Sequence, residues 1–496
     1  MSENNHEHKD TPDHDGDPVS FDIKEYIPVF VVFVVGVVTA SLILAWWYRS
    51  SVVNGIERRL ALSSEKSGFV LSSGTKEDSI KIGEFFKKFS GVPSKQTGSW
   101  PLFRGVNSDN IVPEPVKLAD KWPTNGPAVI WSVDLGEGYA GPVVLNGCVY
   151  VLDYDNQADA DALRCFSMDD GKEIWRRWYH VHIKRNHGMS RTVPAVTERY
   201  AVTIGPRCHV MCVDAKSGDL KWGIDLEREW GTAVPMWYTG QCPLIDGDQV
   251  VLGVGGAELL MGVDCETGKI LWKTPNTKKW QMSHSSVMPM TISGKKMYVY
   301  CAIGGMVGVS AEKADAGKVL WETGEWNHQV VAPAPVHLGD GRIFVTAGYG
   351  EGSAMFKVDQ AQGAYSVRLL YKLDKKIFAC EQHTPIFYKG YLYSVLPADA
   401  GAGKRQAVCM NPDGKVVWLS GSSERFGLGP FIMGDEKMFI LEDNGLLTMI
   451  KASSQGYVKL DQAKVLAGKE AWAPMALANG RLLVRDYGQM KCLDMR

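Results

Sequence analysis

The chain has 496 residues, of which 45% are hydrophobic and 22% are charged, and its formal net charge is −2. This length and apolar content are sufficient for a large buried core. The nearly balanced charge contains no run of Lys and Arg interleaved with aromatic residues, so we expect no nucleic-acid partner.

The first part of the chain predicts a membrane anchor. Residues 1–25 are polar and acidic, a composition typical of a disordered tail. Residues 27–47 carry no charge, and as a helix they would span about 31 Å, the thickness of one bilayer core. Aromatic residues stand at both ends of this run, at 26 and 46–48, as in an interfacial belt. We therefore predict a transmembrane helix over 26–48.

Residues 49–99 are predicted to form a helical stalk with linkers. Two segments, 54–66 and 76–89, have apolar residues spaced near 3.6 positions apart, which favours amphipathic helices. A stalk of this kind would hold the remaining chain away from the membrane.

A ten-residue pattern, VDCETGKILW in its clearest copy at 263–272, then recurs roughly every 46 residues. Each copy has a Gly four residues before a Trp. The Gly supplies the positive φ of a short hairpin turn, and the Trp falls at one phase of the next strand. We interpret these tryptophans as structural, docking one repeat unit on the next; with one at the front of the domain, they are Trp131, Trp175, Trp222, Trp272, Trp321 and Trp418.

A proline in or beside the first strand of each unit gives a second repeat. The eight markers are Pro142, Pro194, Pro243, Pro289, Pro335, Pro385, Pro430 and Pro474. Eight units with room for four strands each predict an all-β, eight-bladed propeller over 100–496. The last unit lacks a fourth strand, and the strand at 128–135 has no blade before it. We therefore expect this N-terminal strand to complete the last blade.

The repeated Gly-x3-Trp hairpin resembles the quinoprotein-like (PQQ-like) propeller superfamily, over about residues 100–496. The segment WPLFRG at 100–105 is similar to the segment that precedes the first blade in many bacterial propellers of this type, which are often membrane-tethered or secreted. The superfamily includes the outer-membrane assembly lipoprotein BamB and quinone-dependent alcohol dehydrogenases. The resemblance implies a fold more strongly than a function, because propellers support many activities.

Three functions agree with this resemblance. We favour an anchored scaffold that binds a protein partner, for instance in envelope assembly. The alternatives are a quinone (PQQ)-dependent oxidoreductase and a sensor that binds a small ligand or polysaccharide in the central funnel. The resemblance implies that the oxidoreductases carry an adjacent Cys pair and calcium ligands, and this chain has no adjacent Cys pair and no matching calcium motif. We therefore expect a non-enzyme, without a quinone cofactor or a metal.

The compartment is predicted from conflicting signals. Basic residues are more numerous after the apolar run than before it, and ten cysteines without a CxxC motif favour a reducing compartment. The resemblance instead implies that the propeller lies outside the cytoplasmic membrane. Large domains translocate against a weak charge bias. We expect a single-pass protein of the inner membrane with its propeller on the periplasmic side.

Candidate binding residues lie in the loops that precede the first strand of each blade. In a propeller these loops open at one mouth of the central channel. His and Arg can bind metals or anions, and Trp suits planar ligands, although such residues can also satisfy one another. The candidates are His187, Arg191, Trp237, Gln241, His284, Trp326, His328, Glu381, His383, Arg425 and Trp472.

Overall fold

The computed structural model describes residues 34, 36–42, 80–184 and 189–496. The chain divides into two compact units, Met1–Glu77 and Asp78–Arg496. The predicted tail, most of the predicted transmembrane helix and residues 49–79 of the predicted stalk lie outside the described residues. Residues 36–42 are helical. Within the described ranges, no helix is long and apolar enough to cross a membrane.

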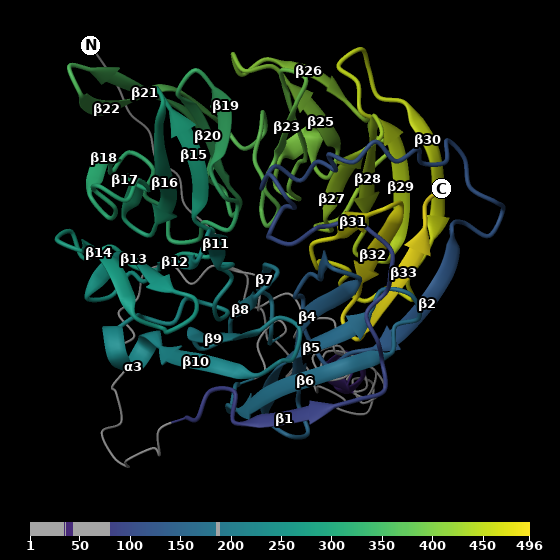
Figure 1. Ribbon diagram of the computed structural model, residues 1–496. Coiled ribbons are helices and arrows are strands. Elements are labelled where there is room, and N and C mark those ends of the chain that lie inside the picture. The colour runs from purple at the N-terminus through teal and green to yellow at the C-terminus, as the bar shows by residue number, and fades with distance from the viewer. Residues whose placement is uncertain (1–33, 35, 43–79, 185–188) are drawn as a thin grey trace, which may run out of the picture. The chain divides into compact units, whose positions relative to one another are not determined.

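The second unit is a ring of eight antiparallel sheets, which confirms the predicted eight-bladed propeller (Figure 1). Blades one to four consist of β3 (Val143–Leu145), β4 (Cys148–Asp155), β5 (Ala160–Ser167) and β6 (Glu173–His180); β7 (Ala195–Val196), β8 (Tyr200–Ile204), β9 (His209–Asp214) and β10 (Leu220–Asp225); β11 (Leu244–Asp246), β12 (Gln249–Gly253), β13 (Glu258–Asp264) and β14 (Ile270–Pro275); and β15 (Met288–Ile292), β16 (Lys295–Ala302), β17 (Gly305–Ser310) and β18 (Val319–Thr323).

The remaining blades follow the same order, with the first strand innermost. They consist of β19 (Val336–Gly339), β20 (Arg342–Ala347), β21 (Gly352–Ala361) and β22 (Ala364–Leu373); β23 (Ile386–Tyr388), β24 (Tyr391–Val395), β25 (Ala407–Met410) and β26 (Val416–Leu419); β27 (Phe431–Gly434), β28 (Lys437–Leu441), β29 (Leu446–Lys451) and β30 (Lys459–Lys464); and β31 (Ala476–Ala478), β32 (Arg481–Arg485), β33 (Gln489–Asp494) and β2 (Ala128–Asp134). Two short helices, α3 (Leu226–Trp230) and η2 (Gly401–Gly403), lie in connections.

The ring closes through β2, as the sequence predicted. This N-terminal strand pairs antiparallel with β33, from Ala128 opposite Asp494 to Asp134 opposite Gln489. Figure 1 shows β2 beside β33 at the outer edge of the eighth blade. Backbone hydrogen bonds in the eighth blade therefore hold the segment that leads into the first blade, and this closes the ring.

The repeated Gly and Trp contact each other between blades. The repeat glycines have positive φ, for example 77° at Gly218 and 71° at Gly268. A Cβ on Gly218 would lie 2.7 Å from the ring of Trp175, and one on Gly268 would lie 2.8 Å from Trp222. At these positions the indole of one blade packs on the turn of the next, and only Gly leaves the space for it. The repeat does not extend to Gly363, where nothing lies within 4 Å of a Cβ.

The prediction of a helix over 76–89 is wrong at its C-terminal end. Residues Phe85–Lys88 form a strand, β1, which pairs antiparallel with β6 and gives the first blade a fifth strand. Phe85 stacks on Trp178 at 5.7 Å, and the guanidinium of Arg177 lies 4.7 Å from the ring of Phe86. The open edge of β6 thus determines this local structure, and helical spacing in the sequence does not.

Candidate functional site

Two kinds of connection open at the same end of the propeller, because strands alternate in direction within each blade. One kind joins an outer strand to the next blade's inner strand, such as residues 226–243 between β10 and β11. The other joins the second and third strands, such as residues 348–351 between β20 and β21. Side chains from both kinds meet around the channel axis.

Three rings from three blades stack at this mouth. Trp237 lies nearly parallel to His284, with ring centroids 6.3 Å apart and 20° between the planes. Tyr349 lies 5.5 Å from Trp237 at 32°. Trp237 and His284 were predicted, and they come from the connections after β10 and β14. Tyr349 comes from the β20–β21 connection, so the stack joins non-adjacent blades.

A buried arginine lies beside this stack. Burial lowers the pKa of Arg191 to about 10, and the nearby hydroxyls of Tyr139, Tyr349 and Tyr238 act in the opposite direction. Burial also lowers the pKa of His284 to about 4, and the charge of Arg191 adds to that shift. His284 is therefore neutral near pH 7, and its Nδ1 has no hydrogen-bond partner among the described residues.

Tyr139, which also lies near Arg191, forms a second aromatic pair with Trp472, in the loop that precedes the eighth blade. Their ring centroids are 5.1 Å apart, and the Tyr139 hydroxyl donates a hydrogen bond to Glu470. Trp472 Nε1 donates to Asp443 Oδ1 at 2.8 Å. We refer to Tyr139, Arg191, Trp237, His284, Tyr349 and Trp472 as the mouth cluster.

His383 lies next to the mouth cluster but is enclosed by backbone. Burial lowers its pKa to about 4, the charge of Arg104 adds to that shift, and backbone hydrogen bonds with Leu428 and Trp472 oppose it. Its ring meets Phe431 edge-on at 6.1 Å. Its contacts are therefore with the neighbouring loops.

Other predicted residues fulfil local structural needs. Gln241 is fully buried: its Oε1 accepts from the Gly253 N–H at 2.8 Å, and its Nε2 donates to the Tyr300 hydroxyl at 3.2 Å. Trp326 is 2% exposed and meets His328 edge-on at 4.3 Å.

The last three predicted residues are held by their own or adjacent loops. His328 Nδ1 lies 2.7 Å from Glu351 Oε2. Arg425 donates to the carbonyl oxygens of Ser422 and Lys404. Glu381 is half-buried against Gly348, where a Cβ would lie 2.6 Å from it. His187 lies outside the described residues.

Sequence reasoning missed Tyr139, Tyr349 and the exposed Met236. The sequence candidates lie in loops before first strands, and Tyr349 lies in a second-to-third strand connection. Because strands alternate in direction within a blade, the sequence already indicates that second-to-third strand connections open at the same end as the loops before first strands. Met236 adjoins Trp237 in a loop before a first strand. The sequence does not indicate that this single Met side chain is 61% exposed.

Comparisons with known proteins agree with this architecture. A family model described as outer membrane protein assembly factor BamB matches residues 158–400. The structure of BamB from Moraxella catarrhalis is 13% identical, covers 74% of this chain and 99% of its own, and has a TM-score of 0.50. The quinohemoprotein alcohol dehydrogenase ADHIIG from Pseudomonas putida HK5 is 14% identical, covers 81% of each chain, and has a TM-score of 0.54.

A third similar structure is the computationally designed Ika8 protein, which is 12% identical, covers 74% of this chain and 100% of its own, and has a TM-score of 0.50. No curated protein matches the chain. This chain is an eight-bladed β-propeller that is similar to the BamB family over residues 158–400. At such low identities the solved structures show the fold alone.

Trp237 at the mouth already makes two ring contacts, with His284 and with Tyr349. A flat cofactor that stacked on this indole would compete with these contacts. Within the described ranges, no group of three His, Cys, Asp or Glu residues has the arrangement of a metal site. The mouth cluster instead offers aromatic surface with one cation, which suits contact with another macromolecule.

Proposed function

We propose that this BamB-like propeller is a protein-interaction scaffold and that a protein partner binds at the mouth cluster. The supporting observation is the exposure of large apolar side chains beside a rigid aromatic stack. Met236 is 61% exposed and Tyr349 is 47% exposed, next to Trp237 and Arg191. Trp, Tyr, Met and Arg are the residue types enriched at protein interfaces and at their energetic hot spots.

The backbone of the mouth favours a preformed surface. Trp237, Tyr238 and Tyr349 have positive φ values of 64°, 70° and 58°. Such conformations cost about 1 kcal/mol or more for a residue with a side chain, so other contacts must hold them. The Tyr238 hydroxyl donates to the Lys184 carbonyl at 2.8 Å, and the Thr239 N–H donates to the Pro206 carbonyl at 3.0 Å. A surface fixed in advance loses less conformational entropy when a partner binds.

The location of the scaffold is part of the same proposal. We propose that residues 26–48 anchor the chain in the inner membrane and that the propeller lies on the periplasmic side, where it acts in envelope assembly. The support is the uncharged run 27–47 and the likeness to a family described as an outer membrane protein assembly factor. A reporter fused after Arg496 tests the orientation: activity of a periplasm-dependent reporter agrees with it, and activity of a cytoplasm-dependent reporter contradicts it.

Site-specific photo-crosslinking in cells tests the binding surface. A photoreactive amino acid is placed at Met236 or Tyr349, and at exposed Gln362 in the β21–β22 turn, which opens at the opposite end of the propeller. We expect one protein adduct at the first two positions and none at Gln362. Trp237→Ala should remove that adduct while the melting temperature stays within a few degrees. The proposal would be contradicted by equal yields of adduct at all three positions. It would also be contradicted if Trp237→Ala left the yield of the adduct unchanged.

A further inference from the structure

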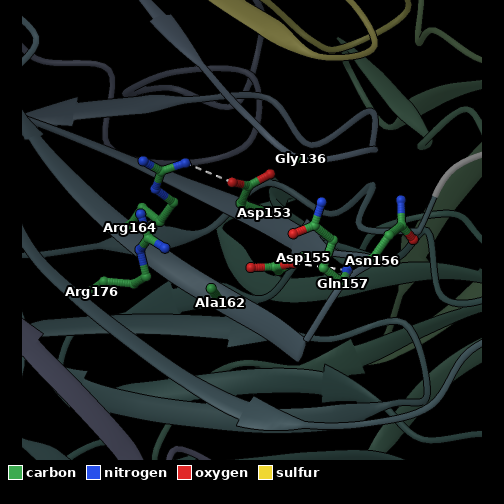
Figure 2. A pocket seen from close by; sticks show the side chains of 8 residues that line it. All are labelled: Gly136, Asp153, Asp155, Asn156, Gln157, Ala162, Arg164 and Arg176. Atoms are coloured by element: carbon green, nitrogen blue, oxygen red, sulfur yellow. Dashed lines mark hydrogen bonds and ion pairs between the residues drawn. The ribbon is translucent and has the colours of Figure 1, made fainter. Parts of the chain in front are cut away.

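A second feature lies away from the mouth cluster, at the junction of the eighth and first blades. It is a cavity of about 330 Å³, which is within the size range of small-molecule sites. Asp153 and Asp155 on β4 and Arg164 on β5 line it, together with residues 156 and 157 of the β4–β5 connection. Figure 2 shows the guanidinium groups of Arg164 and Arg176 on one side and Asp155, Asn156 and Gln157 on the other. We call it the junction pocket.

The wall of the junction pocket is a fixed network of charges. Arg164 Nη1 donates to Asp153 Oδ2 at 2.8 Å, and its Nη2 donates to Glu173 Oε2 at 2.9 Å. Behind Asp153 lies Arg485, which is 0% exposed and donates to the carbonyl oxygens of Leu152 at 2.8 Å and Ala140 at 3.0 Å. Burying charges carries a desolvation cost, and this network limits it through mutual pairing.

The rim of the junction pocket keeps hydrogen-bonding capacity. Asp155 Oδ1 accepts from the backbone N–H groups of Gln157 and Ala158, while its Oδ2 has no partner among the described residues. Arg176 uses Nε and Nη2 on Glu173, both at 2.8 Å, and its Nη1 is unused by the described part of the chain. The pocket therefore presents an acceptor on one side and a donor on the other.

We propose that the junction pocket binds a neutral polyhydroxylated ligand, such as a mono- or disaccharide. A sugar hydroxyl donates and accepts at the same oxygen, so one ligand with several hydroxyls can bond Asp155 Oδ2 at one side of the pocket and Arg176 Nη1 at the other. The polar side chains of Asn156 and Gln157 extend the same pattern along the rim. This site is separate from the mouth cluster and does not depend on the scaffold function.

The charge balance of the lining favours a neutral ligand over an ionic one. Each guanidinium that faces the pocket already pairs with a carboxylate: Arg164 with Asp153 and Glu173, and Arg176 with Glu173. An anionic or cationic ligand would compete with these internal pairs. Hydroxyl groups need only the lone pairs and N–H groups that the network leaves over.

Ligand-observed saturation-transfer NMR on the full chain tests the proposal, in a detergent without a sugar headgroup. The probes are glucose, N-acetylglucosamine and maltose as neutral sugars, and glucuronate and glucosamine as charged ones. We expect transfer to at least one neutral sugar and a weaker response from the charged sugars. Asp155→Asn, which retains the turn acceptor, and Arg176→Gln should each weaken binding about tenfold.

A matched pair on another blade controls for surface charge. Arg368 and Asp359 form an ion pair at 2.9 Å on β22 and β21, outside the junction pocket. Arg368→Gln and Asp359→Asn should leave sugar binding unchanged. The proposal is overturned if no neutral sugar gives transfer, if a charged sugar binds more tightly, or if the control variants weaken binding as much as the pocket variants. Circular dichroism on each variant separates lost binding from lost folding.

Discussion

The indole of Trp131 lies against Gly171, so closely that a Cβ on this glycine would be 2.9 Å from the ring. Trp131 is in β2 of the eighth blade, and Gly171 is in the β5–β6 turn of the first blade. Trp131 Nε1 also donates to the Met168 carbonyl in the first blade at 3.0 Å. The contact that repeats around the ring therefore also joins its two ends.

Substituting this glycine measures the contact. Gly171→Ala places a Cβ against the ring of Trp131 and also puts alanine at a φ of 69°. Gly363 is the matched control, because its φ is 82° but nothing lies within 4 Å of a Cβ there. We expect Gly171→Ala to lower the free energy of unfolding by about 1–3 kcal/mol more than Gly363→Ala, through overpacking. Urea denaturation checks this difference, and equal losses would mean that the indole moves aside freely.

The fifth strand of the first blade gives a second prediction. Lys87→Pro removes a backbone N–H from the pairing of Lys87 with Arg176 and should release β1 from β6. Hydrogen exchange in a peptide covering residues 173–180 should then become faster. Val92→Pro, at a 69% exposed position outside β1, serves as the control. Unchanged exchange in the Lys87→Pro protein would show that β1 adds no protection to the edge of the blade.

Most of the propeller was predictable from the sequence because its turns impose backbone requirements at fixed intervals. A glycine at positive φ recurs in the outer hairpin of seven blades, and a proline recurs in or beside the inner strand of all eight, whatever the rest of the blade contains. The strand β1 was not predictable in the same way. Its residues have helical spacing, and their strand conformation depends on pairing with β6, far away in the sequence.

The candidate site was predictable only in part. Arg191, Trp237, His284 and Trp472 do meet, because their loops open at the same end. Gln241 and Arg425 lie in equivalent loops but bond backbone carbonyls or N–H groups nearby, and no spacing rule distinguishes these two outcomes. The left-handed conformations that present the aromatic rings at the mouth are also invisible in the sequence, because they occur at Trp and Tyr instead of Gly.

The histidine in the mouth cluster should make the propeller less stable in acid. The folded-state pKa of His284 is about 4, below the usual value of 6.5, because the ring is buried. The unfolded chain then binds a proton that the folded chain does not, so stability falls as the pH decreases from about 6.5 to 4. This loss amounts to about 1.4 kcal/mol per pH unit. His284→Gln should reduce the drop in melting temperature between pH 7 and pH 5, and an unchanged drop would contradict the assignment.

A buried carboxyl group should have the opposite dependence on pH. Burial raises the pKa of Asp161 to about 7, although Ser190 Oγ donates to it at 2.7 Å and the Tyr179 hydroxyl at 3.2 Å. The folded chain holds a proton that the unfolded chain releases above its usual pKa of 3.8. The stabilisation is therefore complete below about pH 4 and is lost as the pH rises towards 7.

The neutral variant Asp161→Asn isolates this effect. Its amide can keep hydrogen bonds with Ser190 and Tyr179 but cannot ionise. We expect its melting temperature to exceed that of the natural chain at pH 8 by more than it does at pH 5. Asp161→Ala, which loses both hydrogen bonds, should be destabilised at both pH values. If Asp161→Asn shifted the melting temperature equally at pH 5 and pH 8, the carboxyl group would not titrate in this range, and its burial would be compensated by its two hydroxyl donors alone.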